Sequence, residues 1–600
     1  MFPPTYRTQL WSRLDTPWDI IVIGGGITGA GILREAARLG LRGLLLEQRD
    51  FAWGTSSRSS KLVHGGLRYL KQGKVRLTRA SVQERERLLD EGPGLIDPLG
   101  FLLATYKGDR PGRRMYQAGL SIYDLLALQW SHRYYNAADF ELLAPHVTGE
   151  ALQGGFHYED AQTDDARLVL RVIQEAVADG AAALNYAAVE GLLHAPTGAP
   201  DQRGPVIGVR VVDRGRPHGR TAEVRARAVI NATGTWADRL RGQAGPEPGD
   251  KRRAGGHIRP LRGSHLIFPA WRLPIAQALS FLHPIDRRPV FIFPWEGVTL
   301  VGTTDVDHDQ PLEEEPRISP AETAYLMAAV EAQFPSLNLT LEDVTATLAG
   351  VRPVIGSGKA DPSKEARDHV IWHDNGLLTV TGGKLTTFRR IALDALKAVH
   401  DRLPDLPEPD DKVPVLNPIN VKLSGDGALD EASRRRLLGR YAAEAQALVA
   451  AARSGELTPI EGTQTLWAEL RWAARAEAVL HLDDLLLRRT RLGLLLPNGG
   501  EALLSRVEAI CREELGWDAA RWETEVTAYR ALWRRCYSPP DPATVPDWRV
   551  MLAEARTRRQ VARQTRRRRL IRGTEISGVL MGLAFILGGV WLFRRRRRCG

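Results

Sequence analysis

The pattern of apolar and polar positions predicts strands and helices that alternate near the start of the chain. Residues 19–31 (DIIVIGGGITGAG) begin as an apolar run, pass through a glycine turn and end in the start of a helix. A second apolar run, 43–47 (GLLLE), follows that helix and ends in the carboxylate of Glu47. Strand, glycine turn, helix and second strand are the opening of a dinucleotide-binding unit. The pattern therefore predicts an α/β domain.

Beyond residue 65 the periodicity changes several times. Helical spacing of apolar residues predicts helices at 77–89, 115–128 and 164–180. Strand-like runs predict strands at 183–191, 258–268, 290–294 and 298–305. The later runs suggest an antiparallel substrate sheet threaded between pieces of the first domain.

The C-terminal third reads as helical. Residues 404–418 are rich in Pro and Asp and predict a linker, and residues 429–533 are rich in helical patterns. Within them, 472–495 (WAARAEAVLHLDDLLLRRTRLGLL) combines an apolar stripe with an arginine run. We interpret the stripe as core and the arginines as a solvated face, without a direct catalytic role.

The last segment predicts a membrane anchor. Residues 576–593 carry no charged side chain and lie between arginine clusters at 566–572 and 594–598. As a helix they would span roughly 27 Å, enough for the hydrocarbon core of a bilayer. Basic residues on both sides leave open whether the helix spans the membrane or lies in the interface.

Composition limits the classes of function. With 600 residues, of which 43% are hydrophobic, the chain can form two to four domains. We expect three parts: residues 1–415, with substrate-domain segments at about 70–160 and 240–350; residues 416–545; and residues 546–600. Three cysteines are too few and too late in the sequence for a disulfide framework or a metal cluster, and a cytoplasmic body fits best.

The net charge of +11 belongs to the tail. Residues 547–600 hold 15 Arg and three acids, a local charge of +12, so residues 1–546 carry about −1. A basic body that would bind nucleic acid is not indicated. We expect neither a nucleic-acid partner nor a metal.

The glycine turn has the spacing of a phosphate-binding fingerprint. Gly24, Gly26 and Gly29 fill the three positions of G-x-G-x-x-G, which provide the tight turn, the close approach to phosphate and the close packing of helix on strand. Glu47 ends the second strand, where a carboxylate can hold both ribose hydroxyls and disfavours a 2′-phosphate. A nucleotide is therefore the first ligand to expect.

Three later segments identify a family. Residues 54–70 (GTSSRSSKLVHGGLRYL) form a hydroxyl-rich loop directly after the ribose acid, and residues 228–238 (AVINATGTWAD) and 377–391 (LLTVTGGKLTTFRRI) each pair a strand with a glycine turn. With the opening turn, they resemble the FAD-dependent glycerol-3-phosphate dehydrogenase family, a branch of the D-amino-acid-oxidase-like flavoproteins. The resemblance covers about residues 18–538.

The resemblance implies a fold, a cofactor and a reaction. The fold would be a Rossmann-like FAD-binding domain interleaved with an antiparallel-sheet substrate domain, followed by an all-α domain. The reaction would oxidise the C2 hydroxyl of sn-glycerol 3-phosphate to dihydroxyacetone phosphate, with hydride passing to FAD and electrons to a membrane quinone. The expected location is the cytoplasmic face of the inner membrane, with lipid contacted through the C-terminal tail. The sequence leaves open whether the protein is a homodimer.

Candidate substrate residues come from the same motifs. Arg68, Arg367 and Lys384 match family positions associated with the substrate and are assigned mainly to its phosphate. Arg352, in a tight turn before Pro353, would stabilise the developing alkoxide. His265 would act on the hydroxyl proton, since an imidazole ordinarily titrates in the right range.

Candidate cofactor residues are more numerous. Helix N-termini and backbone amides would face the pyrophosphate and the flavin, and hydroxyls would add further donors. His64 is expected to pack or hydrogen-bond near the cofactor rather than to form a covalent link to it. The full set is Gly24, Gly25, Gly26, Thr28, Gly29, Glu47, Thr55, Ser56, Ser57, Ser60, Lys61, His64, Gly65, Gly66, Val189, Gly234, Gly382, Gly383, Lys384, Leu385 and Thr386.

Three alternatives remain open from the sequence. A glycerol-3-phosphate oxidase would use the same site with O₂ as acceptor. An amine or amino-acid oxidase of the same fold would recognise a carboxylate without a phosphate pocket. A non-catalytic, RNA-associated flavoprotein would need basic residues in the body, which the charge distribution does not provide.

Overall fold

The computed structural model describes the chain except for a few loops and the C-terminal tail. The residues outside the description are 1, 4, 72, 110–111, 198–202, 217–218, 246–256, 357–364, 366–367, 426, 428, 562–563 and 565–600. The tail at 576–593 and Arg367 fall among them. In the described part of the chain, no helix is both long and apolar enough to cross a bilayer.

The first sheet is the predicted dinucleotide-binding sheet. Its strand order is β17-β18-β10-β1-β2-β7. In addition, β9 pairs with the long strand β10, and β8 pairs with β9. The central strands run parallel and β17 runs antiparallel to β18. The strands are β1 (Trp18–Ile23), β2 (Gly43–Leu46), β7 (Ala182–Leu184), β8 (Ala187–His194), β9 (Val206–Asp213), β10 (Thr221–Asn231), β17 (His369–Asp374) and β18 (Leu377–Gly382).

Helices cover this sheet because β1 and β2 are apolar on both faces. Helix α2 (Ile27–Arg38) contacts both α7 (Asp165–Ala178) and α10 (Phe388–Ala398). Gly31 permits the last contact, since a Cβ there would lie 2.8 Å from the Phe388 ring. Helices that are far apart in the sequence therefore pack together beside the glycine turn.

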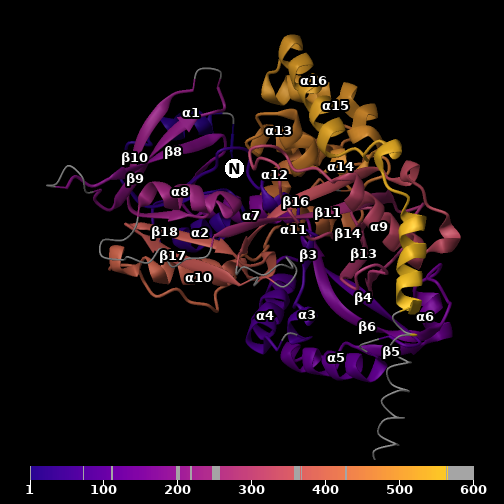
Figure 1. The fold of residues 1–600 in the computed structure, drawn as a ribbon. Helices are drawn as coiled ribbons and strands as arrows, with labels where there is room; N and C mark the ends of the chain where they lie inside the picture. The colour runs from indigo at the N-terminus through magenta and orange to yellow at the C-terminus, as the bar shows by residue number, and fades with distance from the viewer. Residues whose placement is uncertain are drawn as a thin grey trace, which may run out of the picture.

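The second sheet is larger and lies beside the first (Figure 1). Its order is β15-β11-β14-β13-β12-β4-β6-β3, with β16 on β11 and β5 on β6. All pairs are antiparallel except β4 with β12, which run parallel. The strands are β3 (Leu62–Val63), β4 (Ile96–Tyr106), β5 (Arg133–Asn136), β6 (Leu152–Thr163), β11 (Ile258–Pro269), β12 (Ala278–Leu282), β13 (Pro289–Trp295), β14 (Val298–Gly302), β15 (Val306–Asp307) and β16 (Ala346–Ile355).

Two predicted strands differ in detail. The run at 183–191 is divided between β7 and β8, because the chain turns at Asn185 and Tyr186 between two different strand partners. The run at 298–305 ends as a strand at Gly302, and the residues after it line the cavity described below. The predicted Rossmann-like sheet, substrate sheet and helical C-terminal region are confirmed.

Helices complete the second sheet and the C-terminal region. Helices α3, α4 and α5 lie at the lower end of the second sheet, and α12–α16 lie above it (Figure 1). Residues 548–561 are also helical, with Leu552 and Ala555 buried. The helices not yet given bounds are α1 (Tyr6–Trp11), α3 (Leu67–Lys71), α4 (Val75–Glu91), α5 (Arg113–Ala127), α6 (Ala137–Leu143), α8 (Ala237–Ala244), α9 (Pro320–Gln333), α11 (Glu431–Tyr441), α12 (Ala445–Ala451), α13 (Trp467–Ala476), α14 (Leu492–Leu495), α15 (Leu504–Leu515) and α16 (Ala519–Cys536).

The arginine run of the helical region is not a solvated face. Arg488, Arg489 and Arg491 are each only 2% exposed. They form ion pairs with Asp50 and Asp165, which belong to the first part of the chain. The sequence-based interpretation of these arginines is therefore wrong. Spacing along a helix reports which residues share a face, but it does not show that another domain covers that face.

Candidate active site and cofactor cavity

A cavity of about 1070 Å³ lies between the two sheets. Its walls include the carboxyl ends of β1, β2, β10 and β18 on one side and residues of β4, β13 and β16 on the other. The carboxyl ends of parallel strands are where α/β sheets bind nucleotides. The cavity is therefore the candidate site.

The glycine turn forms one end of the cavity. Gly24 has φ +113°, and a Cβ there would lie 2.6 Å from the carbonyl oxygen of Ala232. A Cβ on Gly29 would lie 1.9 Å from the carbonyl oxygen of Gly24. No side chain fits at either position without moving the backbone. Gly26 is the N-cap of α2 and offers no side-chain cap, so the helix start faces the cavity.

Glu47 is held beside this turn. Its carboxylate accepts hydrogen bonds from the backbone N–H groups of Gly25 (2.7 Å) and Arg49 (2.8 Å). Burial raises the pKa of Glu47, while these two N–H groups act against that rise. The bonds orient the carboxylate at the cavity wall, where the ribose acid was predicted.

The serine segment Thr55–Lys61 has two sides. Ser56, Ser59 and Ser60 line the cavity, and Ser56 Oγ accepts a hydrogen bond from the backbone N–H of Ile27 at 2.9 Å. Lys61 faces away from the cavity, because its buried ammonium binds Asp165 and the carbonyl oxygen of Ser57 at 2.8 Å each. Its role is therefore to hold the segment from behind.

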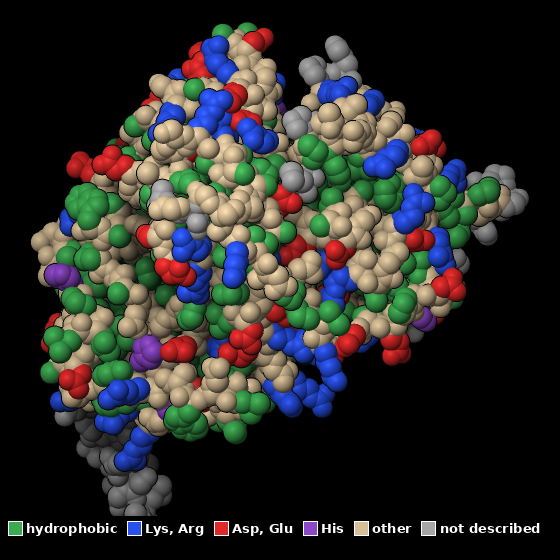
Figure 2. Space-filling view, turned by 180° about the vertical axis from the view of Figure 1, so that it is seen from behind, with side chains coloured by type: hydrophobic (Ala, Val, Ile, Leu, Met, Phe, Trp, Pro, Cys, Tyr) green, Lys and Arg blue, Asp and Glu red, His purple; other side chains and the backbone are tan. Residues whose placement is uncertain are grey.

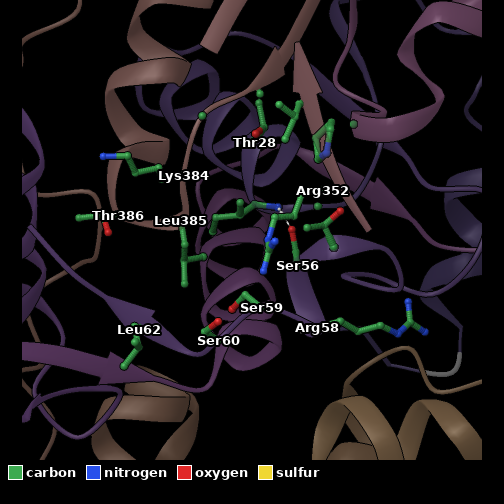
Figure 3. A pocket seen from close by; sticks show the side chains of 18 of the residues that line it. Thr28, Ser56, Arg58, Ser59, Ser60, Leu62, Arg352, Lys384, Leu385 and Thr386 are labelled. Carbon is green, nitrogen blue, oxygen red and sulfur yellow. Dashed lines mark hydrogen bonds between the residues drawn. The ribbon is translucent and has the colours of Figure 1, made fainter. Parts of the chain in front are cut away.

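A second helix start faces the cavity from β18. The turn after β18 contributes Gly382, Gly383, Lys384, Leu385 and Thr386 to the wall. Lys384 precedes the helical turn there without a side-chain cap, and Thr386 Oγ1 donates to the carbonyl oxygen of His64 at 3.2 Å. Figure 3 shows Lys384, Leu385 and Thr386 on one side of the cavity and Arg352 and Ser56 on the other.

These features fit a dinucleotide cofactor. Two helix starts, whose N-cap residues provide no side-chain cap, offer N–H groups and partial positive charge to anionic groups, although Ser56 already accepts from the first N–H of α2. The glycine turn leaves room for a phosphate. The cavity continues beyond the nucleotide-binding part, because aromatic residues of the second sheet also line it. They are Phe101, Tyr158 and Phe291.

The structure brings most of the predicted residues to this cavity. Those that line it are Gly24, Gly26, Thr28, Glu47, Thr55, Ser56, Ser60, His64, Gly66, Val189, Gly234, Arg352, Gly382, Gly383, Lys384, Leu385 and Thr386. Those that stand behind the lining residues are Gly25, Gly29, Ser57, Lys61, Gly65 and His265. The side chain of Arg68 and the whole of Arg367 lie outside the described residues.

Arg352 is a fixed cation on the cavity wall that the second sheet forms. Its guanidinium donates to Asp305 Oδ1 at 3.0 Å and to Thr303 Oγ1 at 2.9 Å, and its side chain is 23% exposed. Gly263 leaves room for it, since a Cβ there would lie 2.2 Å from Nη2. Arg352 is thus held rigidly at the wall of a partly enclosed cavity.

Lys384 is a second cation on the cavity wall. Its Nζ lies 2.9 Å from Ser81 Oγ and 3.7 Å from the ring centroid of Tyr69. These contacts direct the ammonium away from the glycine turn and towards α3 and α4. Lys384 thus belongs to the turn before α10 and extends along the cavity wall to α3 and α4.

His265 is close to the cavity but does not line it. The imidazole is 1% exposed, and its Nε2 lies 3.0 Å from Ser60 Oγ, which does reach the cavity. Burial, and then the charges of Arg352 and Lys61, lower the pKa of His265 to about 3. The expectation of an ordinary pKa therefore does not hold for this protein without ligands, and Ser60 separates the imidazole from the cavity.

The low pKa of His265 predicts a loss of stability in acid. The unfolded chain takes up a proton near pH 6.5 but the folded chain does so only near 3, so stability falls as the pH falls through this window. The limiting slope for one such group is about 1.4 kcal/mol per pH unit. We expect His265→Gln to flatten the acid side of a plot of unfolding free energy against pH, measured by urea titration.

The control for this prediction is the exposed His400, just after α10. His400→Gln should leave the acid side of the plot unchanged. Equal slopes for His265→Gln and the unmodified protein would show that His265 is not protonated on unfolding in this range.

Several lining residues were missed by sequence reasoning. They are Trp53, Arg58, Tyr69, Tyr158, Arg288, Phe291, Thr303 and Asp305. Thr303 and Asp305 follow directly after β14, in a polar run that the sequence analysis assigned to the strand. The aromatic residues carry no local signal, because an aromatic residue on a strand is usually core.

Comparison with known proteins agrees with the geometry. A family model described as FAD dependent oxidoreductase matches residues 19–389, and one described as the C-terminal domain of alpha-glycerophosphate oxidase matches residues 412–522. Aerobic glycerol-3-phosphate dehydrogenase of Bacillus subtilis (strain 168) is 40% identical over 397 residues, which cover 66% of this chain and 68% of that protein. The protein with the same name from Staphylococcus aureus (strain USA300) is 35% identical over 501 residues, 79% of this chain and 86% of that one.

Solved structures give the same result. Glycerol-3-phosphate dehydrogenase from Bacillus halodurans, complexed with FAD, has a TM-score of 0.69 and 28% identity over 89% of this chain and 98% of that chain. L-alpha-glycerophosphate oxidase from Mycoplasma pneumoniae, with FAD bound, has a TM-score of 0.51 and 16% identity, over 68% of this chain and 100% of that chain, and shows the shared fold alone. This chain, with its cavity between a nucleotide-binding sheet and an aromatic-lined second sheet, belongs to the FAD-dependent glycerol-3-phosphate dehydrogenase family.

Proposed function

We propose that this protein oxidises sn-glycerol 3-phosphate to dihydroxyacetone phosphate with FAD as hydride acceptor and a membrane quinone as the final acceptor. The observation that carries the proposal is the combination of the family relationship with two cations, Arg352 and Lys384, on the wall of the cofactor cavity. A doubly charged phosphate needs cations, and a secondary alcohol needs a group that stabilises its oxygen.

The cofactor is held along the length of the cavity. Glu47 would hold the ribose, the N-terminus of α2 and Ser56 would hold the pyrophosphate, and the turn before α10 would hold the flavin end. When bound, FAD supplies the hydride acceptor for the substrate C2–H. The partial positive charge of the second helix start would favour a flavin that accepts negative charge.

Residues of the cavity bind the substrate phosphate, stabilise the C2 oxygen and accept the hydroxyl proton. Lys384, Arg68 and Arg367 bind the phosphate. Arg352 stabilises negative charge on the C2 oxygen, and it is not the base because a guanidinium stays protonated. The hydroxyl proton passes to Ser60 Oγ while the Ser60 proton passes to His265 Nε2, which lies 3.0 Å away.

The experiment that tests the reaction is anaerobic bleaching of the flavin absorbance. Glycerol 3-phosphate should bleach it, while lactate, glycine and glycerol should not. Bleaching by glycine but not by glycerol 3-phosphate would support an amino-acid oxidase instead. Stoichiometric peroxide in air, without reduction of an added quinone, would support an oxidase.

An exposed apolar surface supports a membrane acceptor. Leu125 on α5 and the following Leu128 and Trp130 are 67%, 88% and 71% exposed. Met115 and Ile122, also on α5, are both exposed and part of the cavity wall. Hydrophobic side chains gather at the lower edge of the molecule, the end at which α5 lies (Figures 1 and 2). We call Met115, Ile122, Leu125, Leu128 and Trp130 the α5 surface.

The α5 surface joins the cavity to the lipid phase. Arg113 and Arg114 at the start of α5 are exposed, where they can meet anionic head groups. A quinone dissolved in lipid would approach the flavin along this apolar path. The proposed location is therefore the cytoplasmic face of the inner membrane, with the tail at 576–593 as a second attachment.

A double variant tests the α5 surface. Leu125→Glu with Leu128→Glu should lower reduction of a quinone in phosphatidylglycerol-containing vesicles by about tenfold or more, because two large apolar side chains no longer enter the lipid. Turnover with a water-soluble dye should be unchanged. Trp271→Glu, at another exposed apolar residue, is the matched control. Equal loss with dye and quinone would contradict a role in membrane access.

A further inference from the structure

The helical C-terminal region packs behind the wall of the cofactor cavity, and residues 484–491 make several of its contacts with the first domain there. Asp484–Arg489 form a π-helical turn, and Arg491 follows with φ +62°. Three arginines of this segment, Arg488, Arg489 and Arg491, point into the first domain and are buried. A buried guanidinium is retained only where acceptors surround it.

The first acceptor is Asp50, which follows the ribose acid Glu47 closely in the sequence. Its fully buried carboxylate accepts from Arg489 at 2.6 and 2.7 Å and from Arg488 at 2.5 Å. Burial alone would raise the pKa of Asp50, but the two guanidinium groups lower it to about 2. Asp50 therefore remains a carboxylate, and the start of the cofactor loop is tied to the C-terminal region.

The second set of acceptors lies behind the serine segment. Arg491 donates to Asp164 Oδ1 at 3.0 Å, to Asp165 and to the carbonyl oxygen of Ser57 at 3.2 Å. These acceptors come from two parts of the chain, the start of α7 and the cofactor loop. One planar guanidinium thus joins them, which a lysine ammonium with a single nitrogen cannot do in the same geometry.

Asp165 connects Arg491 to residues of the cavity wall. Its carboxylate accepts from the Ser59 N–H at 2.9 Å, from Ser59 Oγ at 2.7 Å and from Lys61 Nζ at 2.8 Å. Ser59 and Ser60 line the cavity on the other side of the segment, and Ser60 contacts His265. Arg491 therefore lies directly behind residues that face the cofactor.

We infer that Arg491 is a positioning residue of the FAD site, so that the C-terminal region determines how tightly and in which orientation the cofactor is bound. This inference rests on the proposal above that the serine segment contacts FAD. Arg491 itself lies outside the cavity lining and acts through Asp165 and the carbonyl oxygen of Ser57. Arg488 and Arg489 act in the same way on Asp50.

The test is a titration of the apoenzyme with FAD, in which quenching of flavin fluorescence measures binding. Arg491→Met should raise the Kd for FAD at least tenfold and change the visible circular dichroism of the bound flavin. Arg491→Lys, which keeps the charge but not the fork of donors, should give an intermediate Kd. Asp165→Asn should raise the Kd as well, and it keeps the inference testable if Arg491→Met does not fold.

The matched control is Arg471, a buried arginine whose partners Glu456, Glu513 and Glu514 all lie within the C-terminal region. Arg471→Met should lower thermal stability and leave the Kd for FAD unchanged. If Arg491→Met and Arg471→Met lose stability alike and both keep the Kd of the unmodified protein, the inference is overturned. Failure of the unmodified apoenzyme to bind FAD would instead overturn the proposed function.

Discussion

Arg352→Ala is expected to slow reduction of the bound flavin by glycerol 3-phosphate by about 10²–10³-fold, the usual loss when one preorganised donor to a developing oxyanion is removed. Asp305 and Thr303 hold the guanidinium in place before substrate arrives, so no reorganisation is needed during the reaction. FAD should stay bound, because Arg352 lies on β16 of the second sheet, away from the glycine turn. Stopped-flow reduction at saturating substrate measures the rate, and absorbance at the flavin band measures occupancy.

The control for Arg352 is Arg239, which also lines the cavity but has a 69% exposed side chain. Arg239→Ala should reduce flavin at nearly the normal rate. An unchanged rate in Arg352→Ala would remove this residue from the mechanism. A loss of FAD in the same variant would show that Arg352 supports the cofactor rather than the transition state.

Gly29→Ala is expected to abolish retention of FAD during purification. The new Cβ would lie 1.9 Å from the carbonyl oxygen of Gly24, so α2 must move away from β1 or the turn must open. Either change displaces the helix start that faces the cofactor. Overpacking of this kind also costs about 1–3 kcal/mol of folding stability, which urea unfolding of the apoenzyme would measure.

The matched change is Gly242→Ala in α8, where a Cβ would meet no atom within 4 Å. Alanine is the better helix former there, so the free energy of unfolding should rise by up to about 1 kcal/mol, with FAD content unchanged. Normal FAD content in Gly29→Ala would show that the turn tolerates a side chain and that packing does not determine the glycine.

The parts of the fold that the sequence predicted are those with local signals. Strand β1 and its glycine turn combine an apolar run with residues that only a tight backbone accepts, so their position could be read directly. The same holds for the turn at Gly382 and Gly383, which have positive φ. Family resemblance then placed these turns around one flavin, which spacing alone would not have done.

The parts that were missed depend on contacts between distant segments. The arginines of the run near residue 490 carry the same pattern whether water or another domain covers them. Their partners, Asp50 and Asp165, show that another domain covers them, and these partners lie in the N-terminal third of the chain. The low pKa of His265 has the same origin, because burial and the charges of Arg352 and Lys61 are properties of the folded chain.

The order of strands around β1 constrains how this enzyme is made. Strand β1 is synthesised before its parallel neighbour β10, which ends at Asn231, and the turn before α10 is complete only at Thr386. Before Ala232 is synthesised, the glycine turn lacks the carbonyl that it packs against, and before Thr386 the cavity lacks its second helix start. Flavin loading therefore requires the chain at least through residue 386, and a ribosome stalled before that residue carries a product that cannot retain its cofactor.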